Sequence, residues 1–334
     1  MGLADFSRID DFGDAAAEAR ACRNDCALFD FSFLECARLK GTGARDVVEK
    51  FTGRSLAALE PGKIFYALRV NGEGAVMADL TVWRVGADCY DVMSGRHEDV
   101  VDLLHRADSD LEVTDVSNDI AVLALQGPNA LEVLGRLGDT SQIRPLGYFG
   151  FSETALGGTP CRVGRLGYTG EAGFEIILPR AAAENSWRIW SRLVRPAGFI
   201  AADMLRIEAG FVLFDNEFRV PVSPGEVGLG RFYRSGGFGR PPLTLISFYA
   251  EANTLSLPWR PSGNLRRPVK LGEVLVTSAC RSNAAGGILG LGYVRADTEA
   301  GARCYDPTGA FQNIRRTSLP FYDTAKRRPR IAWR

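Results

Sequence analysis

Alternation of apolar and polar residues predicts strands along much of the chain. Runs with a period of two that are rich in Val, Ile, Leu, Phe and Tyr suit a pleated strand with at least one buried face. We expect strands at residues 27–33, 65–70, 75–85, 89–93, 111–116, 120–125, 151–156, 161–166 and 174–178. Turn-forming glycines separate several of these runs, which favours antiparallel neighbours.

A period near 3.6 predicts six helices between these strands. They fall at residues 13–24, 42–51, 96–106, 128–138, 180–195 and 201–214. We expect Thr42 to cap the second helix and Pro128 to open the fourth at its first position. Two successive sets of strands with helical cover predict an α+β region that reaches to about residue 240.

The pattern changes after residue 239. Residues 240–271 are rich in Pro, Ser and Arg, and short strand runs follow at 273–278, 287–294 and 303–305, with 243–248 as a candidate first strand. Short strands separated by frequent turns indicate a small β-barrel or sandwich. We therefore predict two regions, residues 1–240 with two α+β subdomains and residues 241–334 as a β-barrel domain.

One predicted strand carries a carboxylate in its interior. Alternation places Met77, Asp79, Thr81 and Trp83 on one face of residues 75–85, and the even-numbered apolar residues on the other face. Strand interiors select against Asp, so a lined pocket would explain Asp79. An edge strand with the carboxylate in water explains the spacing equally well.

Composition excludes several classes of function. The 334 residues are 46% hydrophobic and 24% charged, with a formal net charge of zero, which predicts no nucleic-acid partner. The basic residues near the end of the sequence are expected to be solvated. They are Lys326, Arg327, Arg328, Arg330 and Arg334. No apolar run approaches the ~20 residues of a membrane span, and the first residues do not resemble a signal peptide.

Histidine and cysteine limit the chemistry further. The seven cysteines are scattered without a CxxC pair, which predicts reduced thiols in a cytoplasmic protein. Only two histidines occur, His97 and His105, so the sequence predicts no metal centre and argues against a Ser-His-Asp triad. Proton transfer would then fall to Asp, Glu, Tyr or solvent.

A second acid, Glu175, lies in an apolar strand after a Gly-rich turn at residues 167–173. A buried carboxylate needs hydrogen-bond partners, which a ligand rich in N–H donors or a salt bridge to Arg165 could supply. Aromatic residues lie on or beside the same strands and suit either a core or a flat heterocyclic ligand. They are Tyr66, Trp83, Tyr148, Phe149 and Tyr168.

Six ordered segments of the chain resemble the aminomethyltransferase family, whose type member is the T-protein of the glycine cleavage system. Residues 71–80, NGEGAVMADL, are similar to the family segment N-x-x-G-G-x-x-D-D-L. The other five segments are residues 124–128, 167–171, 206–210, 224–229, and 272–274 together with 277–278. The resemblance extends from about residue 26 to residue 322.

This resemblance implies three domains in a cloverleaf around a central opening that holds tetrahydrofolate or a one-carbon-substituted form of it. Asp79 matches the catalytic aspartate, and Glu175 matches the acid that receives the amino and N–H groups of the pterin. The matching cofactor-binding positions along the cavity are Tyr168, Tyr66, Tyr148 and Phe149, with Trp83 where a Tyr is usual.

The chain also departs from the family pattern. Ala78 replaces the first Asp of the usual pair, and Ala202 stands where an Arg is usual. The early G-W-x-M-P segment is absent, and Phe33 stands where a D-x-S-H segment would end in His. These departures argue against a lipoyl carrier protein as partner and favour a relative that exchanges one carbon with a different small molecule.

The resemblance therefore predicts a tetrahydrofolate-dependent one-carbon transferase that acts on a small-molecule donor or acceptor. Two alternatives stay open. One is a true glycine cleavage aminomethyltransferase. The other is a folate-binding protein without transferase chemistry, as in the family branch linked to iron–sulfur protein maintenance, although the K-x-C-x-x-G type of motif typical of that branch is absent here.

Overall fold

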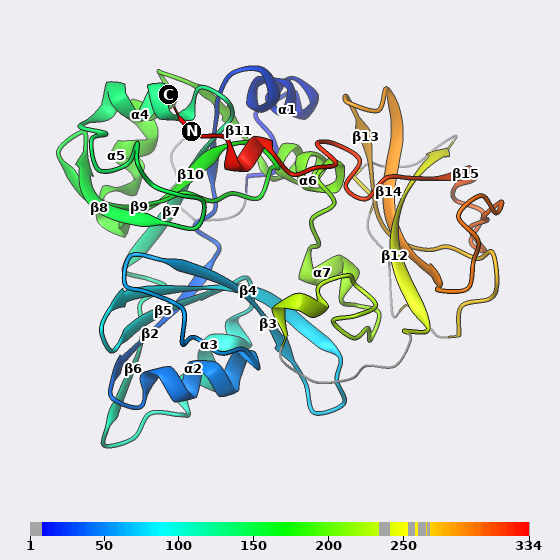
Figure 1. Cartoon of the computed structure of the whole chain (residues 1–334). Coiled ribbons are helices and arrows are strands. Elements are labelled where there is room, and N and C mark those ends of the chain that lie inside the picture. The colour runs from blue at the N-terminus through cyan, green and yellow to red at the C-terminus, as the bar shows by residue number, and fades with distance from the viewer. Residues whose placement is uncertain (1–8, 234–240, 253–257, 260–264, 266–267, 334) are drawn as a thin grey trace.

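A computed structural model describes residues 9–233, 241–252, 258–259, 265 and 268–333 of the chain. Three β-sheets with flanking helices lie around a central helical segment (Figure 1). The predicted mixed α+β fold is thereby confirmed. Arg334 of the basic terminal group and parts of the Pro-, Ser- and Arg-rich segment at 240–271 lie outside the described residues.

The first sheet has six strands in the order β11-β1-β7-β10-β9-β8 (upper left in Figure 1). All neighbours are antiparallel except β1 and β11. The strands are β1 (Ala27–Asp30), β7 (Ile120–Gln126), β8 (Phe151–Leu156), β9 (Thr159–Gly164), β10 (Gly173–Pro179) and β11 (Arg195–Ala197). Helices α4 (Ala130–Leu137) and α5 (Arg180–Trp190) cover one face, against which Trp187 and Trp190 are buried. The other face is turned towards the centre of the molecule.

The second sheet has five antiparallel strands in the order β3-β4-β5-β2-β6 (lower left in Figure 1). They are β2 (Glu35–Gly41), β3 (Ile64–Val70), β4 (Val76–Gly86), β5 (Cys89–Ser94) and β6 (Leu111–Asp115). Helices α2 (Ala44–Thr52) and α3 (His97–Leu104) cover the face that carries Leu80 and Val82. The predicted even-numbered core face of β4 is confirmed, because Val76, Ala78, Leu80 and Val82 are all buried.

The third sheet has four antiparallel strands in the order β13-β14-β12-β15. They are β12 (Leu243–Glu251), β13 (Leu275–Ser282), β14 (Gly287–Arg295) and β15 (Gln312–Thr317). Strand β15 was not predicted, because its polar sequence QNIRRT lacks apolar alternation. A closed barrel in this region stays a prediction.

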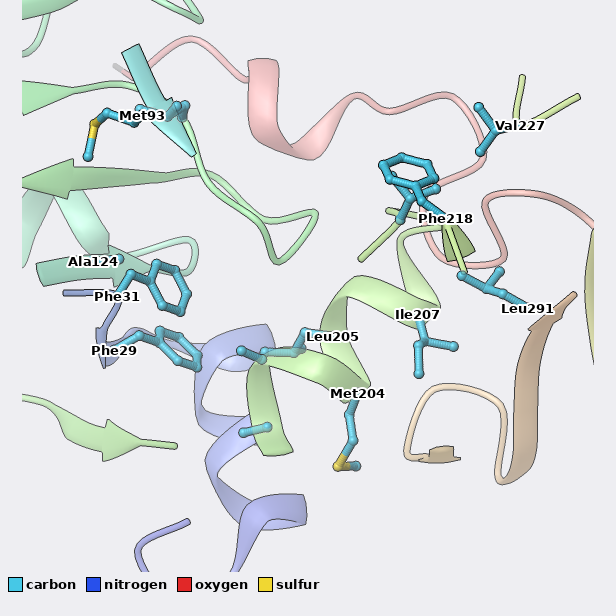
Figure 2. Close-up of a cluster of buried hydrophobic side chains, with 14 of the residues drawn as sticks. Phe29, Phe31, Met93, Ala124, Met204, Leu205, Ile207, Phe218, Val227 and Leu291 are labelled. Carbon is cyan, nitrogen blue, oxygen red and sulfur yellow. The ribbon is translucent and has the colours of Figure 1, made fainter. Parts of the chain in front are cut away.

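The centre of the molecule is built from α1 (Ala15–Asn24), α6 (Phe199–Glu208) and the short helix α7 (Phe214–Glu217). Helix α6 is buried along nearly its whole length, so it packs against neighbours on every side. One hydrophobic cluster joins it to all three sheets. Figure 2 shows Phe29 of β1, Met93 of β5 and Leu291 of β14 together with Leu205 of α6.

Several predicted helix boundaries differ from the observed ones by one to a few residues, as is usual for fraying helix ends. The prediction that Thr42 caps α2 is wrong, because Gly43 holds that position without a side-chain hydrogen bond. Pro128 does not open α4, which begins at Ala130. His105 lies just beyond the end of α3. None of the helices in the described residues is long and apolar enough to cross a membrane.

Candidate active site

A cavity of about 730 Å³ lies where the three sheets meet. Its walls come from β3, β4, β12, the segment after α6, and residues 227–232. The terminal segment, defined here as residues 318–333, adds Leu319, Pro320, Lys326, Pro329 and Arg330. This segment leaves the third sheet and crosses to the first one, as the red ribbon in Figure 1 shows. Residues that are far apart in the sequence therefore share one cavity.

Asp79 lies on the wall of this cavity. Strand β4 has β3 and β5 as neighbours, so the alternative of an edge-strand carboxylate in water is excluded. The Tyr66 hydroxyl donates a hydrogen bond of 3.1 Å to Asp79 Oδ2. Burial raises the pKa of Asp79 to about 6, although the Tyr66 hydrogen bond opposes this rise. The carboxylate is therefore mostly charged at neutral pH and can take up a proton in mild acid.

Four aromatic residues that the family resemblance places along the cavity also line this space. They are Tyr66, Tyr148, Phe149 and Tyr168. The Tyr168 hydroxyl donates to the Val212 carbonyl oxygen at 2.5 Å, and its ring stacks on Phe211 with centroids 6.1 Å apart. Such fixed aromatic walls are suited to a flat ligand.

Phe149 adopts a left-handed backbone conformation with φ of 66°. This conformation is unfavourable for a residue with a side chain. It is held by two backbone hydrogen bonds, from Phe149 to the Arg165 carbonyl oxygen at 2.9 Å and from Ile64 to the Phe149 carbonyl oxygen at 2.8 Å. The second bond joins the first sheet region to β3. Strained backbone that is fixed by its surroundings is typical of functional sites.

Trp83 is not among the residues that line the cavity. Its indole is fully buried against Phe151, with ring centroids 5.3 Å apart, and its N–H donates to the Thr81 hydroxyl at 3.0 Å. A Cβ built at Gly164 would come within 2.2 Å of this indole, so the glycine makes room for it. Alternation along the strand predicted that Trp83 faces the pocket. The indole instead fills the space between the second sheet and the first.

Glu175 is only 8% exposed and lies in β10, between β7 and β9. The expected alternative of a salt bridge to Arg165 is not formed, because Arg165 donates to the backbone oxygens of Leu146 and Ile331. Among the described residues, the Glu175 carboxylate has no hydrogen bond or ion pair. Burial alone raises its pKa to about 7.

Glu175 does not line the cavity wall, but it lies close to a residue that does. Burial raises the pKa of Tyr148 to about 12, and the charge of Glu175 contributes to this rise. A buried, unpaired carboxylate next to an aromatic wall is unfavourable for folding unless a ligand supplies donors. Of the two acids predicted from the sequence, Asp79 therefore lies on the cavity wall and Glu175 lies beside it.

Two of the substituted family positions lie away from the cavity surface. Ala78 and Ala202 are fully buried and do not belong to its wall. Ala202 instead packs in the central hydrophobic cluster around α6. A longer side chain at either position would need space in the surrounding core.

Four cationic residues on the cavity wall were missed by the sequence analysis. They are Arg54, Arg231, Lys326 and Arg330. The only signal for them was the basic stretch near the end of the sequence, which was expected to be solvated. Arg54 lies in a loop and Arg231 in the short 3₁₀ helix Gly230–Phe232, and no sequence pattern joins them.

A buried ionic network lies behind Asp79. Arg206 donates to Asp203 at 2.7 Å, to Glu217 at 2.9 Å and to the Ser278 hydroxyl at 2.6 Å. Burial opposes the charge of Arg206, but Glu217 and Asp203 raise its pKa, so it stays protonated. Glu217 raises and Arg206 lowers the pKa of Asp79. The network therefore joins α6, α7 and the third sheet and also influences the acid in the cavity.

Comparisons with known proteins agree with the fold. The model of a family described as the GCVT N-terminal domain matches residues 4–235. An aminomethyltransferase from Streptomyces avermitilis is 30% identical over 94% of this chain and 91% of its own length. One from Halothermothrix orenii is 29% identical over 84% of this chain and 83% of its own length.

One solved structure has a similar overall fold. It is the glycine cleavage system aminomethyltransferase T from Bartonella henselae, with a TM-score of 0.74 and 24% identity. The match covers 93% of this chain and 90% of that one, and at this identity it shows a shared fold.

Proposed function

The chain belongs to the aminomethyltransferase family that carries the GCVT N-terminal domain, and on this premise we propose that it is a tetrahydrofolate-dependent one-carbon transferase acting on a small molecule. The observation that carries this proposal is Asp79 on the cavity wall, hydrogen-bonded to Tyr66 and surrounded by aromatic rings. We further propose that residues 1–240 form the folate-binding region and that residues 241–334 form a β-barrel domain, which adds Leu245 and the terminal segment to the cavity wall.

In this proposal, the cavity around Asp79 would hold a reduced folate, which would supply the nitrogens that carry the transferred carbon. Such a nitrogen would bear positive charge or a proton when the carbon is transferred. The Asp79 carboxylate can stabilise that charge or hold the proton, because its pKa of about 6 is near the working pH. The aromatic walls exclude water and orient the flat ring.

Glu175 is the proposed acceptor for the amino and N–H groups of the pterin. It is buried, has no hydrogen-bond partner among the described residues, and lies near Tyr148. A ligand with several N–H donors would supply the missing hydrogen bonds and favour the charged carboxylate. Folate binding at pH 6 should then release protons, because the pKa of Glu175 would fall from about 7 on binding.

Glu175→Ala should weaken binding of tetrahydrofolate by about 1–3 kcal/mol, because the pterin donors would be left without a buried acceptor. Calorimetry at pH 7.5 measures this loss. In the wild-type protein affinity should fall as the pH drops below about 7, where Glu175 becomes protonated, and Glu175→Gln should lack this dependence. The exposed acid in α5 provides the control Glu184→Gln, which should bind folate normally. Unchanged affinity in Glu175→Ala would reject the assignment.

We also predict that this protein does not replace a glycine cleavage T-protein. The motivation is the missing G-W-x-M-P segment, Ala202 in place of the usual Arg, and Ala78 in place of the first Asp. Glycine cleavage should be reconstituted with lipoyl-loaded carrier protein, tetrahydrofolate and this chain, with the Bartonella henselae aminomethyltransferase as positive control. The expected result is no ammonia release, together with one-carbon transfer to or from a methylated small molecule. Rapid formation of methylene-tetrahydrofolate would favour a true glycine cleavage enzyme instead.

A further inference from the structure

The terminal segment, residues 318–333, forms a wall between the cavity and the solvent. Pro320 and Pro329 are buried and line the cavity, whereas Leu319 and Ile331 are among the exposed large hydrophobic residues. The segment crosses from the third sheet to the first, as the red ribbon in Figure 1 shows. One side of the segment therefore meets the cavity and the other meets water, so its displacement would open the cavity.

Little backbone pairing holds this segment in place. Its regular structure among the described residues is the short 3₁₀ helix Arg328–Arg330. In the part of the chain that the structure describes, one backbone-to-backbone hydrogen bond joins the segment to the other residues, from the Tyr322 N–H to the Glu208 carbonyl oxygen at 2.8 Å. The strands around the cavity are instead paired along continuous ladders. A wall with so few backbone hydrogen bonds opens at a lower free energy than a sheet does.

Side chains that meet at one carboxylate hold the segment instead. Glu171 lies in the Gly-rich turn before β10, accepts a hydrogen bond of 2.7 Å from the Tyr322 hydroxyl and pairs with Arg328 at 3.2 Å. It also pairs at 3.0 Å with Arg23 of α1, whose guanidinium lies 3.8 Å from the centroid of the Tyr322 ring. We call Glu171, Arg23, Tyr322 and Arg328 the latch.

The latch is buried where it belongs to the body of the protein and half exposed where it belongs to the segment. The side chain of Glu171 is 2% exposed, and that of Arg328 is 48% exposed. When Tyr322 and Arg328 move away, Glu171 keeps Arg23 as its counter-ion, and Arg23 also keeps its ion pair with Glu208 at 2.8 Å. Release of the segment therefore leaves no buried charge without a partner, which makes it a low-cost step.

The middle of the segment lies between two aromatic anchors. Phe321 contacts Tyr249 with ring centroids 5.4 Å apart, and Trp333 stacks on Phe174 with centroids 5.7 Å apart. Residues 322–330 between them include the cavity-lining residues Lys326, Pro329 and Arg330. This part can move away from the cavity while both ends stay attached.

The backbone of this middle part is strained in the observed position. Asp323 and Lys326 both adopt left-handed conformations with φ of 50°, which is unfavourable for residues with a side chain. Asp323 also accepts a hydrogen bond of 2.7 Å from the Arg328 N–H, so the strained loop is closed on itself. Strain of this kind persists only where other contacts oppose its release. The latch supplies such contacts.

We infer that residues 322–330 are a gate to the cavity and that the latch at Glu171 keeps this gate closed. The inference rests on the proposed function, because the ligand that passes the gate is the reduced folate. Opening breaks the contacts of Tyr322 and Arg328 with Glu171 and connects the cavity with solvent. Glu171 does not line the cavity, so it is a positioning residue that acts through the segment.

Trypsin measures the opening, because Lys326 lies within the gate and a protease cleaves a chain that is locally unfolded. Glu171→Gln and Arg328→Gln should each be cleaved after Lys326 about tenfold faster than the wild-type protein, since each loses a charge-assisted contact of the latch. Mass spectrometry identifies the cleavage site. Because the Arg328 side chain is half exposed, Arg328→Gln should keep the urea midpoint of the wild-type protein, which separates gate opening from global unfolding.

The matched control is Arg327→Gln. Arg327 is exposed, belongs to the same segment and neither contacts Glu171 nor lines the cavity. This variant should be cleaved after Lys326 at the wild-type rate. Unchanged cleavage in both latch variants would overturn the inference.

Stopped-flow fluorescence with tetrahydrofolate tests passage through the gate. In both latch variants the association and dissociation rate constants should rise together, so that Kd changes less than either of them. A faster dissociation with wild-type association would make the segment a fixed wall and contradict the gate. If the wild-type protein binds no tetrahydrofolate, the proposed function is wrong, and cleavage after Lys326 still decides whether Glu171 holds the segment closed.

Discussion

Asp79→Asn should lower turnover by about 10²- to 10⁴-fold while changing folate affinity far less. The asparagine keeps the shape of the side chain and can still accept the Tyr66 hydrogen bond, but it can neither carry charge nor take up a proton. Turnover and folate affinity are measured separately, by single-turnover kinetics with saturating folate and by calorimetry. A similar loss in both would make Asp79 a binding residue. A fully active variant would rule out a catalytic role for Asp79.

The pH profile distinguishes a catalytic acid from a structural one. In the wild-type protein, kcat should rise as the pH increases through about 6, where Asp79 loses its proton. This limb should be absent from the residual activity of Asp79→Asn. Tyr66→Phe removes the hydrogen bond that lowers the pKa of Asp79, so the limb should move to higher pH. An unmoved limb in Tyr66→Phe would assign it to another group.

Arg206→Met should lower the free energy of unfolding by about 3–5 kcal/mol, because Asp203 and Glu217 would remain buried without their cation. Both side chains of each ion pair with Arg206 are fully buried, and Glu217 also accepts hydrogen bonds from Thr277 and Ser278. Breaking a buried pair from one side leaves an uncompensated charge. Urea unfolding followed by tryptophan fluorescence measures the loss.

The control for this prediction is an exposed ion pair. Arg295 and Asp297 have side chains 44% and 49% exposed, so Arg295→Met should change stability by less than about 1 kcal/mol. In Arg206→Met the activity limb assigned to Asp79 should also shift to higher pH, because Arg206 lowers the pKa of that acid. A loss below about 1 kcal/mol would show that the two carboxylates are stabilised by other groups.

Much of the local structure follows from the sequence. Alternation in β4 places Val76, Ala78, Leu80 and Val82 on a buried face and Asp79 on the opposite one, because successive side chains in a strand point to opposite sides. The order of motifs also identified the family, and the expected aromatic positions at Tyr66 and Tyr168 meet at one cavity. These features are encoded within short stretches of sequence, where the spacing of residues alone determines the face to which each side chain points.

The tertiary structure decided which distant residues meet. Alternation could not show that Trp83 would fill the gap beside Gly164, because that depends on how two sheets pack. It also could not show whether Glu175 pairs with Arg165, whose donors are taken by backbone oxygens of other segments. Such contacts join segments that are far apart in the sequence, and the local hydrophobic pattern contains no information about which distant segments meet.

The four cationic residues of the cavity wall are the clearest example of this division. By itself, the sequence determined that residues 326–330 are basic, and it determined the strand that presents Asp79. Only the tertiary structure decided that the terminal segment crosses between sheets and brings Lys326 and Arg330 to the same cavity as Arg54 and Arg231. The physical reason is that the position of this segment depends on long-range partners such as Glu171 and Phe174, and no local propensity specifies them.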